Sequence, residues 1–235
     1  MIEADGLVKK YGSFTAVENI SFSLEPGRIL GFLGPNGAGK TTVMRMLAGY
    51  HFPDSGSIKI DGMLLDENSP GLKNHIGYLP ENTPLYADMT PAEHLMFASE
   101  ARLIPKKDRP EAVRTALELC GLVNHGNQRI ETLSRGYRQR VGLAQAIVHD
   151  PSVLILDEPM TGLDPVQIIE IRDLIREMGK KKTIIMSTHI LQEVRSVCTC
   201  YMILYEGKIA SQGAMDQNEI DLEKIFIDLC AKKAR

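Results

Sequence analysis

Apolar positions in the first part of the chain, to about Asp61, form short runs of β-favouring residues. The turn sequences Glu25-Pro26-Gly27 and Pro53-Asp54-Ser55-Gly56 separate several of these runs. The runs that we expect to form strands span residues 2–8, 14–17, 20–24, 29–33 and 57–60. Their close spacing between residues 20 and 33 predicts antiparallel pairing beside the strand at 29–33.

The middle of the chain, from about Asn82 to Asp150, has helical spacing instead. Thr90-Pro91-Ala92-Glu93 is typical of a helix start, because the threonine side chain can accept from the amide of Glu93 while Glu93 reaches back. We expect helices that begin at Thr90, span residues 111–120, and follow Ser134.

Beyond Pro151, strand-like and helical runs alternate. The expected strands cover residues 153–156, 183–187 and 201–204. A helix begins at Asp164-Pro165, an N-cap followed by a proline suited to the first turn. Residues 221–231 predict a short amphipathic helix. Alternation of apolar strands with helices indicates a parallel sheet covered on both faces.

Composition places the chain among ordinary soluble globular proteins, with 235 residues, 43% of them hydrophobic and 24% charged. The net charge of −3 gives no basic field, so we expect no nucleic-acid partner. No apolar run approaches the ~20 residues of a membrane-spanning helix, and the first residues do not resemble a signal peptide. We therefore expect a cytoplasmic protein. The cysteines lack zinc-ligand spacing and predict reduced, structural thiols at Cys120, Cys198, Cys200 and Cys230.

Residues 34–41 read G-P-N-G-A-G-K-T, which is a complete phosphate-binding pattern. Its glycines allow backbone amides to approach a phosphate, and the helix that follows adds positive potential. Lys40 supplies a cation for the β- and γ-phosphates, and the Thr41 hydroxyl is placed to ligate Mg²⁺. A chance glycine-rich turn is the alternative, but the strand before and the helix after favour a nucleoside triphosphate site. The predicted nucleotide-binding residues here are Gly34, Pro35, Asn36, Gly37, Ala38, Gly39, Lys40, Thr41 and Thr42.

The apolar run at 153–156 ends in two acids, Asp157 and Glu158. In an α/β sheet, such a strand delivers carboxylates beside the phosphate loop. Asp157 suits a magnesium role, mostly through water. Glu158 is expected to point the other way and to orient or deprotonate the attacking water. The alternative is an acidic cap on the next helix.

Residues 133–140, L-S-R-G-Y-R-Q-R, resemble the L-S-G-G-Q signature of ATP-binding cassette (ABC) ATPases, and other motifs follow in that family's order. Tyr11 matches the aromatic residue that stacks on adenine, and Glu81 lies where the family usually has a glutamine. Gly162-Leu163-Asp164-Pro165 matches the D-loop, and His189 matches the switch histidine. The resemblance covers nearly the whole chain.

This resemblance implies an α/β fold: a P-loop NTPase (RecA-like) parallel-sheet core, an N-terminal antiparallel β subdomain and an inserted α-helical subdomain. Residues 1–235 would be one nucleotide-binding domain. Its ATP-binding core would comprise residues 1–81 and 151–220, and residues 82–150 would form the helical subdomain with the signature motif. Residues 221–235 would hold the short C-terminal helix.

The resemblance also implies an ATPase that powers export through a separate permease, on the cytoplasmic face of the membrane. The permease would dock near residues 81–103. Two copies, identical in the simplest case, would form a head-to-tail dimer in which Ser134 and Gly136 act on the ATP of the partner chain. Catalysis would use Lys40, Glu158 and His189, and the Mg²⁺ ligands would be Thr41, Glu81 and Asp157.

Some residues depart from the family pattern. Arg135 replaces a glycine of the signature and Tyr137 replaces its glutamine. Glu81 keeps an oxygen ligand for Mg²⁺ but adds a negative charge, and an acid that caps a helix is an equal alternative. The segment Gly77-Tyr78-Leu79-Pro80-Glu81 ends in Pro-Glu. This ending resembles that of exporter-type cassettes in multidrug, ion and gliding-motility systems.

Two other classes of protein deserve comparison. A soluble cassette protein acting on ribosomes, DNA repair or chromosomes usually carries a second cassette, a long coiled coil, a zinc module or a basic linker, and none is found here. A regulatory module that binds ATP without hydrolysing it conflicts with the presence of Glu158 and His189. The transporter subunit remains the leading hypothesis.

Overall fold

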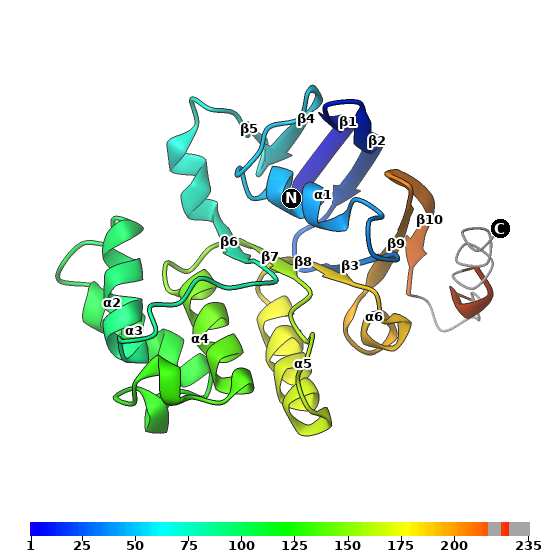
Figure 1. Ribbon diagram of the computed structural model, residues 1–235. Coiled ribbons are helices and arrows are strands. Elements are labelled where there is room, and N and C mark those ends of the chain that lie inside the picture. Colours follow the sequence, from blue (N-terminus) through cyan, green and yellow to red (C-terminus); the bar gives the residue numbers. More distant parts are fainter. Residues whose placement is uncertain (216–221, 226–235) are drawn as a thin grey trace.

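The computed structural model describes residues 1–215 and 222–225 of the chain. Within these residues the strands form two sheets, a small antiparallel one and a larger, mostly parallel one, and a group of helices extends to one side (Figure 1). Residues 222–225 are helical, as expected. The rest of the helix predicted at 221–231, together with Cys230, lies outside the described residues.

The small sheet has the strand order β2-β1-β4-β5 and is antiparallel throughout. Its strands are β1 (Ile2–Tyr11), β2 (Phe14–Leu24), β4 (Ser55–Ile60) and β5 (Met63–Leu64). β2 unites the two runs expected at 14–17 and 20–24. Asn19 adopts a positive φ of 54°, and the register with β1 shifts at this point, so the strand continues through a bulge.

The larger sheet has the order β10-β9-β3-β8-β7-β6. Its strands are β3 (Ile29–Leu33), β6 (Ile76–Leu79), β7 (Val153–Asp157), β8 (Thr183–Thr188), β9 (Cys200–Tyr205) and β10 (Lys208–Ala214). All neighbours are parallel except β10, which runs antiparallel to β9 at the edge. The predicted parallel sheet is confirmed.

The predicted antiparallel pairing beside β3 is wrong. β3 pairs with β8 and β9, both parallel to it, while β2 pairs with β1 in the small sheet. Every residue of β3 is buried, whereas β2 alternates between buried and exposed positions. A strand that is apolar on both faces belongs inside a covered sheet, and an alternating strand belongs where one face meets water.

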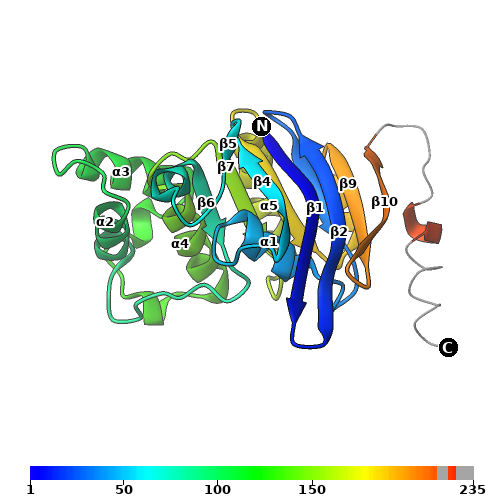
Figure 2. The ribbon, with the colours of Figure 1, turned by 90° about the horizontal axis from the view of Figure 1, so that it is seen from above.

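Side chains from the larger sheet enter two separate cores, one on each face. Seen from above, the small sheet and α1 (Lys40–Leu47) lie in front of the larger sheet (Figure 2). On one face, Phe32 of β3 packs with α1 and the small sheet. On the other, Leu33 packs with α5 (Pro165–Gly179) and α6 (Leu191–Val197). Neighbouring residues of one strand face opposite ways, so the phosphate loop at the end of β3 is held from both sides.

The helical region contains α2 (Pro91–Ala101), α3 (Arg109–Leu119) and α4 (Arg135–Ile147), with short 3₁₀ turns η2 (Val123–His125) and η3 (Ile130–Thr132) between them. Another 3₁₀ turn, η1 (Pro70–His75), precedes β6. The predicted capping box is confirmed: the Thr90 hydroxyl accepts from the amide of Glu93 at 3.2 Å, and the Glu93 carboxylate accepts from the amide of Thr90 at 2.9 Å.

Sequence patterns missed β6, β10 and α6. β6 is four residues long and contains a glycine, α6 spans only seven residues, and β10 is an edge strand with no fully buried residue. Periodicity is weak over such short segments. In the described part of the chain, no helix is both long enough and apolar enough to cross a membrane.

Candidate functional site

The loop between β3 and α1 is shaped by glycines that tolerate no side chain. Gly39 has φ 100°, and a Cβ there would lie 2.5 Å from the carbonyl oxygen of Ala16. A Cβ on Gly34 would lie 2.5 Å from the carbonyl oxygen of Leu204. No side chain caps the first turn of α1, so its amides are available to an anion. The expected phosphate cradle is therefore formed by the backbone.

A cavity of about 510 Å³ opens over this loop. It brings together most residues predicted for the nucleotide, the metal and catalysis. These are Asn36, Gly37, Ala38, Gly39, Lys40, Thr41, Thr42, Glu81, Glu158 and His189. The cavity is also lined by Phe14, Ala16 and Thr161, which sequence analysis did not identify.

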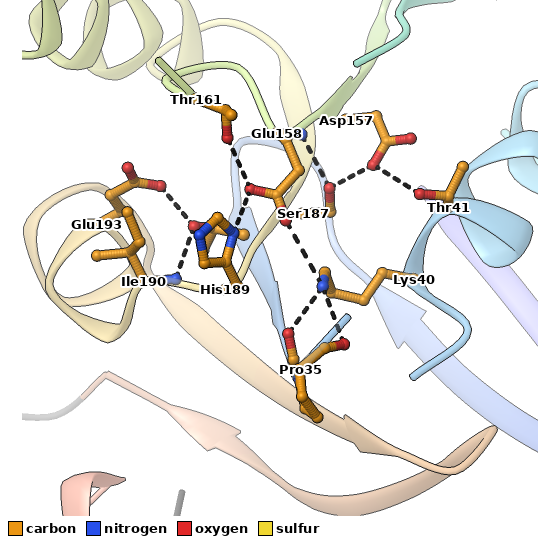
Figure 3. Close-up of polar contacts among 12 residues, drawn as sticks. Pro35, Lys40, Thr41, Asp157, Glu158, Thr161, Ser187, His189, Ile190 and Glu193 are labelled. Carbon is orange, nitrogen blue, oxygen red and sulfur yellow. Dashed lines mark hydrogen bonds and ion pairs between the residues drawn. The ribbon is translucent and has the colours of Figure 1, made fainter. Parts of the chain in front are cut away.

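Lys40 folds back onto its own loop. Its ammonium group donates to the carbonyl of Gly34 at 2.7 Å and to that of Pro35 at 3.3 Å, and it lies 3.5 Å from the Glu158 carboxylate (Figure 3). Only 6% of Lys40 is exposed. Gly34 and Pro35 thus act through their carbonyl groups, and they do not line the cavity. A buried ammonium needs such partners because desolvation penalises an isolated charge.

Asp157 lies at the end of β7 and is 1% exposed. Its Oδ1 accepts from the hydroxyl of Ser187 at 2.5 Å and from that of Thr41 at 3.4 Å (Figure 3). Burial raises the pKa of the carboxyl above its usual range, although these two hydrogen bonds oppose the effect. Ser187 was missed as a site residue, and its position at the end of the neighbouring strand was the available signal.

The second oxygen of Asp157, Oδ2, is buried and has no hydrogen-bond partner among the described residues. A buried carboxylate oxygen without a partner is costly, so it fits a position that a cation fills. The Thr41 hydroxyl beside it supplies another oxygen, and hard oxygen donors are what Mg²⁺ prefers. These residues therefore suit a magnesium ion. Glu81 reaches the same cavity, is exposed, and is not the N-cap of α2, which is Thr90.

Glu158 directs its carboxylate toward His189 and Lys40. Its Oε2 lies 3.0 Å from His189 Nδ1 and accepts from the Thr161 hydroxyl at 3.1 Å (Figure 3). The backbone adopts a positive φ of 50°, and the Glu158 amide donates to the Ser187 hydroxyl at 2.9 Å. The positive φ turns the Glu158 side chain away from that of Asp157, so the two neighbouring carboxylates have different hydrogen-bond partners.

The aromatic side chain in the cavity wall is Phe14 rather than Tyr11. Tyr11 ends β1, is 45% exposed and meets the ring of His51 edge-on at 6.4 Å. Phe14, its partner across the β1–β2 turn, is 61% exposed. The structure therefore brings a second exposed ring to the place where a base could stack, and nothing in the sequence pattern had distinguished it.

The signature residues lie outside the cavity lining. Ser134 is the exposed N-cap of α4 and accepts from the amide of Tyr137 at 3.4 Å. Gly136 is buried, and a Cβ there would lie 2.5 Å from the side chain of Gln167. Arg135 turns toward its own chain, donates to the carbonyl of Thr161 at 3.1 Å and covers Gly162. The signature is thus packed against the D-loop of the same chain.

Tyr137, which replaces the glutamine of the signature, is held from two sides. Its ring centroid lies 3.9 Å from that of His125, and the Arg140 guanidinium lies 5.9 Å from the ring. Arg140 also pairs with Glu170 of α5 at 2.6 Å. An aromatic residue at this place therefore packs between η2 and α4.

Comparison with known proteins matches residues 17–161 to the ABC transporter family. The bacitracin transport ATP-binding protein BcrA of Bacillus licheniformis is 38% identical over 92% of this chain and 70% of its own length. A solved ATP-binding subunit of an ABC transporter has a TM-score of 0.86 and 27% identity, and covers 98% of this chain and 99% of its own. The dimeric post-hydrolysis state of the ATP-binding cassette MJ0796, bound to ADP and Pi, has a TM-score of 0.82, covering 92% and 99% of the two chains. At 21% identity it shows the fold alone.

Proposed function

The chain belongs to the ABC transporter family as an ATP-binding and ATP-hydrolysing subunit, and from this we propose how its residues bind ATP and drive transport. The observation that carries the proposal is the convergence in one cavity of the phosphate loop and the Glu158–His189 pair, with the buried Asp157 hydrogen-bonded to Thr41 of the cavity lining. Each group matches one requirement of phosphoryl transfer: phosphate binding, an oxygen-ligand metal site and activation of water.

ATP would bind with its phosphates over the amides of residues 36–42. Lys40 would exchange the carbonyls of Gly34 and Pro35 for β- and γ-phosphate oxygens, so its ammonium group keeps its hydrogen-bond acceptors. The adenine would stack against an aromatic ring of the β1–β2 turn, Tyr11 or Phe14, since such stacking is worth ~1–3 kcal/mol.

Thr41, Asp157 and Glu81, which also lines the cavity, would hold Mg²⁺. The ion would supply charge neutralisation at the β- and γ-phosphates. Asp157 would contribute its unpartnered Oδ2, while Ser187 keeps the other oxygen in place.

Glu158 would accept a proton from the attacking water as the oxygen of that water bonds to the γ-phosphorus and the bond to ADP breaks. His189 lines the same cavity and would donate from Nδ1 to the Glu158 carboxylate and, with a proton on each ring nitrogen, from Nε2 to the γ-phosphate. Thr161 keeps the Glu158 carboxylate turned in this direction.

A second copy of the chain would complete each site. Ser134 and Gly136 do not line the cavity of their own chain, and Ser134 is exposed at the N-terminus of α4, where helix amides favour an anion. In a head-to-tail dimer these residues would close over the partner's γ-phosphate, and hydrolysis would release the clamp. The cassette MJ0796, which has the same fold, is described as dimeric.

A separate permease would dock in the groove between α1 and α2. Two adjoining cavities of about 350 and 760 Å³ share Tyr50, Tyr78 and Arg102. Large apolar side chains stand exposed there, with Tyr50 68% and Phe97 47% accessible. Such a patch is suited to a helix of a membrane subunit. We propose export as the direction, on the Pro80-Glu81 ending that resembles exporter-type cassettes, and a cytoplasmic position beneath the permease.

Glu158→Gln tests the proposal, because it keeps the shape of the side chain but removes the base. With Mg²⁺ and ATP, we expect phosphate release to fall by about 100-fold or more, while an ATP-bound dimer persists in light scattering. Lys40→Ala should lose both ATP binding and the ATP-dependent dimer. Glu177→Gln, an exposed glutamate on α5, serves as the matched control.

Two results would contradict the proposal. Normal turnover by Glu158→Gln would exclude Glu158 as the base. Unchanged ATP-dependent dimers of Lys40→Ala would exclude a site shared between two chains.

A further inference from the structure

Glu193 is a buried carboxylate four residues after His189 in the chain, and the mechanism above does not use it. Glu193 is 7% exposed and belongs to the first turn of α6. Its Oε2 accepts a hydrogen bond of 2.5 Å from the hydroxyl of Thr188, the residue that precedes His189 (Figure 3). The contact therefore joins α6 to the end of β8, from which the histidine extends.

The same hydroxyl also holds the residue that follows the histidine. Thr188 Oγ1 accepts from the amide of Ile190 at 3.0 Å. Ile190 is the N-cap of α6 and has no side-chain acceptor of its own. In an ordinary capping box the acid at the third helical position takes the N-cap amide directly. Here the Thr188 hydroxyl stands between them, so one chain of hydrogen bonds brackets His189 from both sides.

The carboxylate decides which way this hydroxyl points. A threonine hydroxyl can rotate about its C–O bond, and it donates one proton while accepting at its lone pairs. Because Glu193 takes the proton, the lone pairs are left to face the amide of Ile190. Burial raises the pKa of Glu193, while the hydrogen bond from Thr188 opposes that rise. The Glu193 carboxylate is thus held where it is desolvated. An uncharged hydrogen-bond acceptor could have capped α6, which is only seven residues long.

His189 needs such support because its own position is open. Its side chain is 43% exposed, and its described polar contact is the one from Nδ1 to Glu158 Oε2 at 3.0 Å. An imidazole that must meet both a carboxylate and a phosphate requires a fixed backbone, since a misplacement of about 1 Å can lower a rate 10²-fold.

We propose that Glu193 is a positioning residue for ATP hydrolysis, which acts through the Thr188 hydroxyl to fix the backbone on both sides of His189. The imidazole is then held against Glu158 with its other nitrogen toward the γ-phosphate. This inference rests on the proposed role of His189 in hydrolysis.

Steady-state phosphate release by the full chain tests the inference. Glu193→Ala should lower kcat by about tenfold and leave KM for ATP within about twofold, because the phosphate loop is untouched. Glu193→Gln keeps an oxygen acceptor and should restore most of kcat. Thr188→Val removes the hydroxyl without changing charge or shape and should match Glu193→Ala, whereas Thr188→Ser should be close to the original protein.

Thr90→Ala is the control for a merely structural effect, because it removes the capping box of α2 in the helical region. It should lower the unfolding temperature and leave kcat unchanged. A Glu193→Ala protein that is also less stable but keeps its kcat would overturn the inference, as would a Thr188→Val protein with normal kcat.

The role of His189 in hydrolysis and the positioning role of Glu193 can be tested separately. If Glu193 acts through His189, Glu193→Ala should have no further effect in a His189→Ala background. A slow His189→Ala protein alongside normal Glu193→Ala turnover would overturn this inference alone. Normal turnover by His189→Ala would overturn the proposed role of the histidine and this inference with it.

Discussion

Lys40 and Glu158 lie 3.5 Å apart with less than a tenth of either side chain exposed, so both charges have partners before ATP binds. Leaving one of two buried partners alone is costly, whereas replacing a partner by a phosphate oxygen is not. The nucleotide site is thus prepared for exchange of ligands. Asp157 is the exception, since one of its oxygens is left without a partner among the described residues.

Arg135 departs from the signature motif, and its contacts in the folded chain differ from what its sequence position suggests. From the sequence it adds a large charged side chain to a motif that relies on close approach. In the structure the guanidinium lies over Gly162 and binds the carbonyl of Thr161. It thereby joins the signature to the loop whose Thr161 hydroxyl contacts Glu158.

A histidine outside the site makes stability depend on pH. His149 follows α4, and its Nε2–H donates to the carbonyl of Ile76 in β6 at 3.1 Å, which leaves Nδ1 buried and unpartnered among the described residues. Burial, and then the nearby charge of Arg102, lower the pKa of His149 to about 4. The folded protein therefore resists the proton that this histidine would accept near pH ~6.5 when unfolded.

We expect stability to fall as the pH drops from ~6.5 toward 4, because in this window the unfolded chain binds a proton that the folded chain lacks. The contribution of His149 is about 3 kcal/mol across the window. His149→Gln keeps an N–H donor and should flatten this part of the profile. Urea unfolding at pH 7 and pH 5 measures it, with the exposed His75→Gln as control. An equally steep profile for His149→Gln would contradict the assignment.

At the scale of elements, helix starts are decided by local side chains. The capping boxes at Thr90 and Asp164 form within a few residues of sequence; the first was predicted as a box and the second as an N-cap followed by proline. Asp164 has a wider role, since its box partner Gln167 also covers Gly136 of the signature. The start of α5 therefore supports the start of α4.

Thr90→Ala should lower the free energy of unfolding by about 1 kcal/mol, since it leaves the amide of Glu93 without its acceptor. For a chain of this size that corresponds to a fall of about 2–4 °C in the unfolding temperature. Differential scanning calorimetry measures the change. Thr90→Ser, which retains the hydroxyl, should stay close to the original temperature, and an equal loss in both variants would exclude the cap as the cause.

At the scale of the whole molecule, the nucleotide cavity and the groove proposed to receive the permease are linked by secondary structure. α1 begins in the phosphate loop and ends at Leu47, and its C-cap Ala48 lines the groove. Tyr78 of β6 lines the groove as well, and burial raises its pKa to about 12, so its phenol remains neutral. Tyr50 packs against it at 5.2 Å between ring centroids.

Phe97→Glu should weaken docking of the permease, because it places a charge among exposed aromatic side chains of α2 and its neighbours. We expect recovery of this subunit with its membrane partner to fall on the order of tenfold, while ATP hydrolysis by the isolated subunit is unchanged. Leu119→Glu changes a similarly exposed apolar residue on α3, away from the groove, and serves as control. Equal losses in both variants would exclude the groove as the docking site.

Much of the fold could be predicted because its signals are local. Apolar β3, β7 and β8, the capped helices and the phosphate loop each depend on neighbouring residues, and the structure confirms them. Short or polar elements could not be predicted. β6 and β10 form because an adjacent strand pairs with them, and α6, only seven residues long, packs Val194 and Val197 into the core.

The sequence by itself therefore determined the family, the phosphate loop and the acids at the end of β7, because motif spacing encodes them directly. Tertiary structure alone decided what these residues touch. It placed β3 between β8 and β9, brought Phe14 into the cavity wall and turned Arg135 onto Thr161. These contacts join segments whose separation in the chain carries no pattern, and only packing brings them within hydrogen-bonding distance.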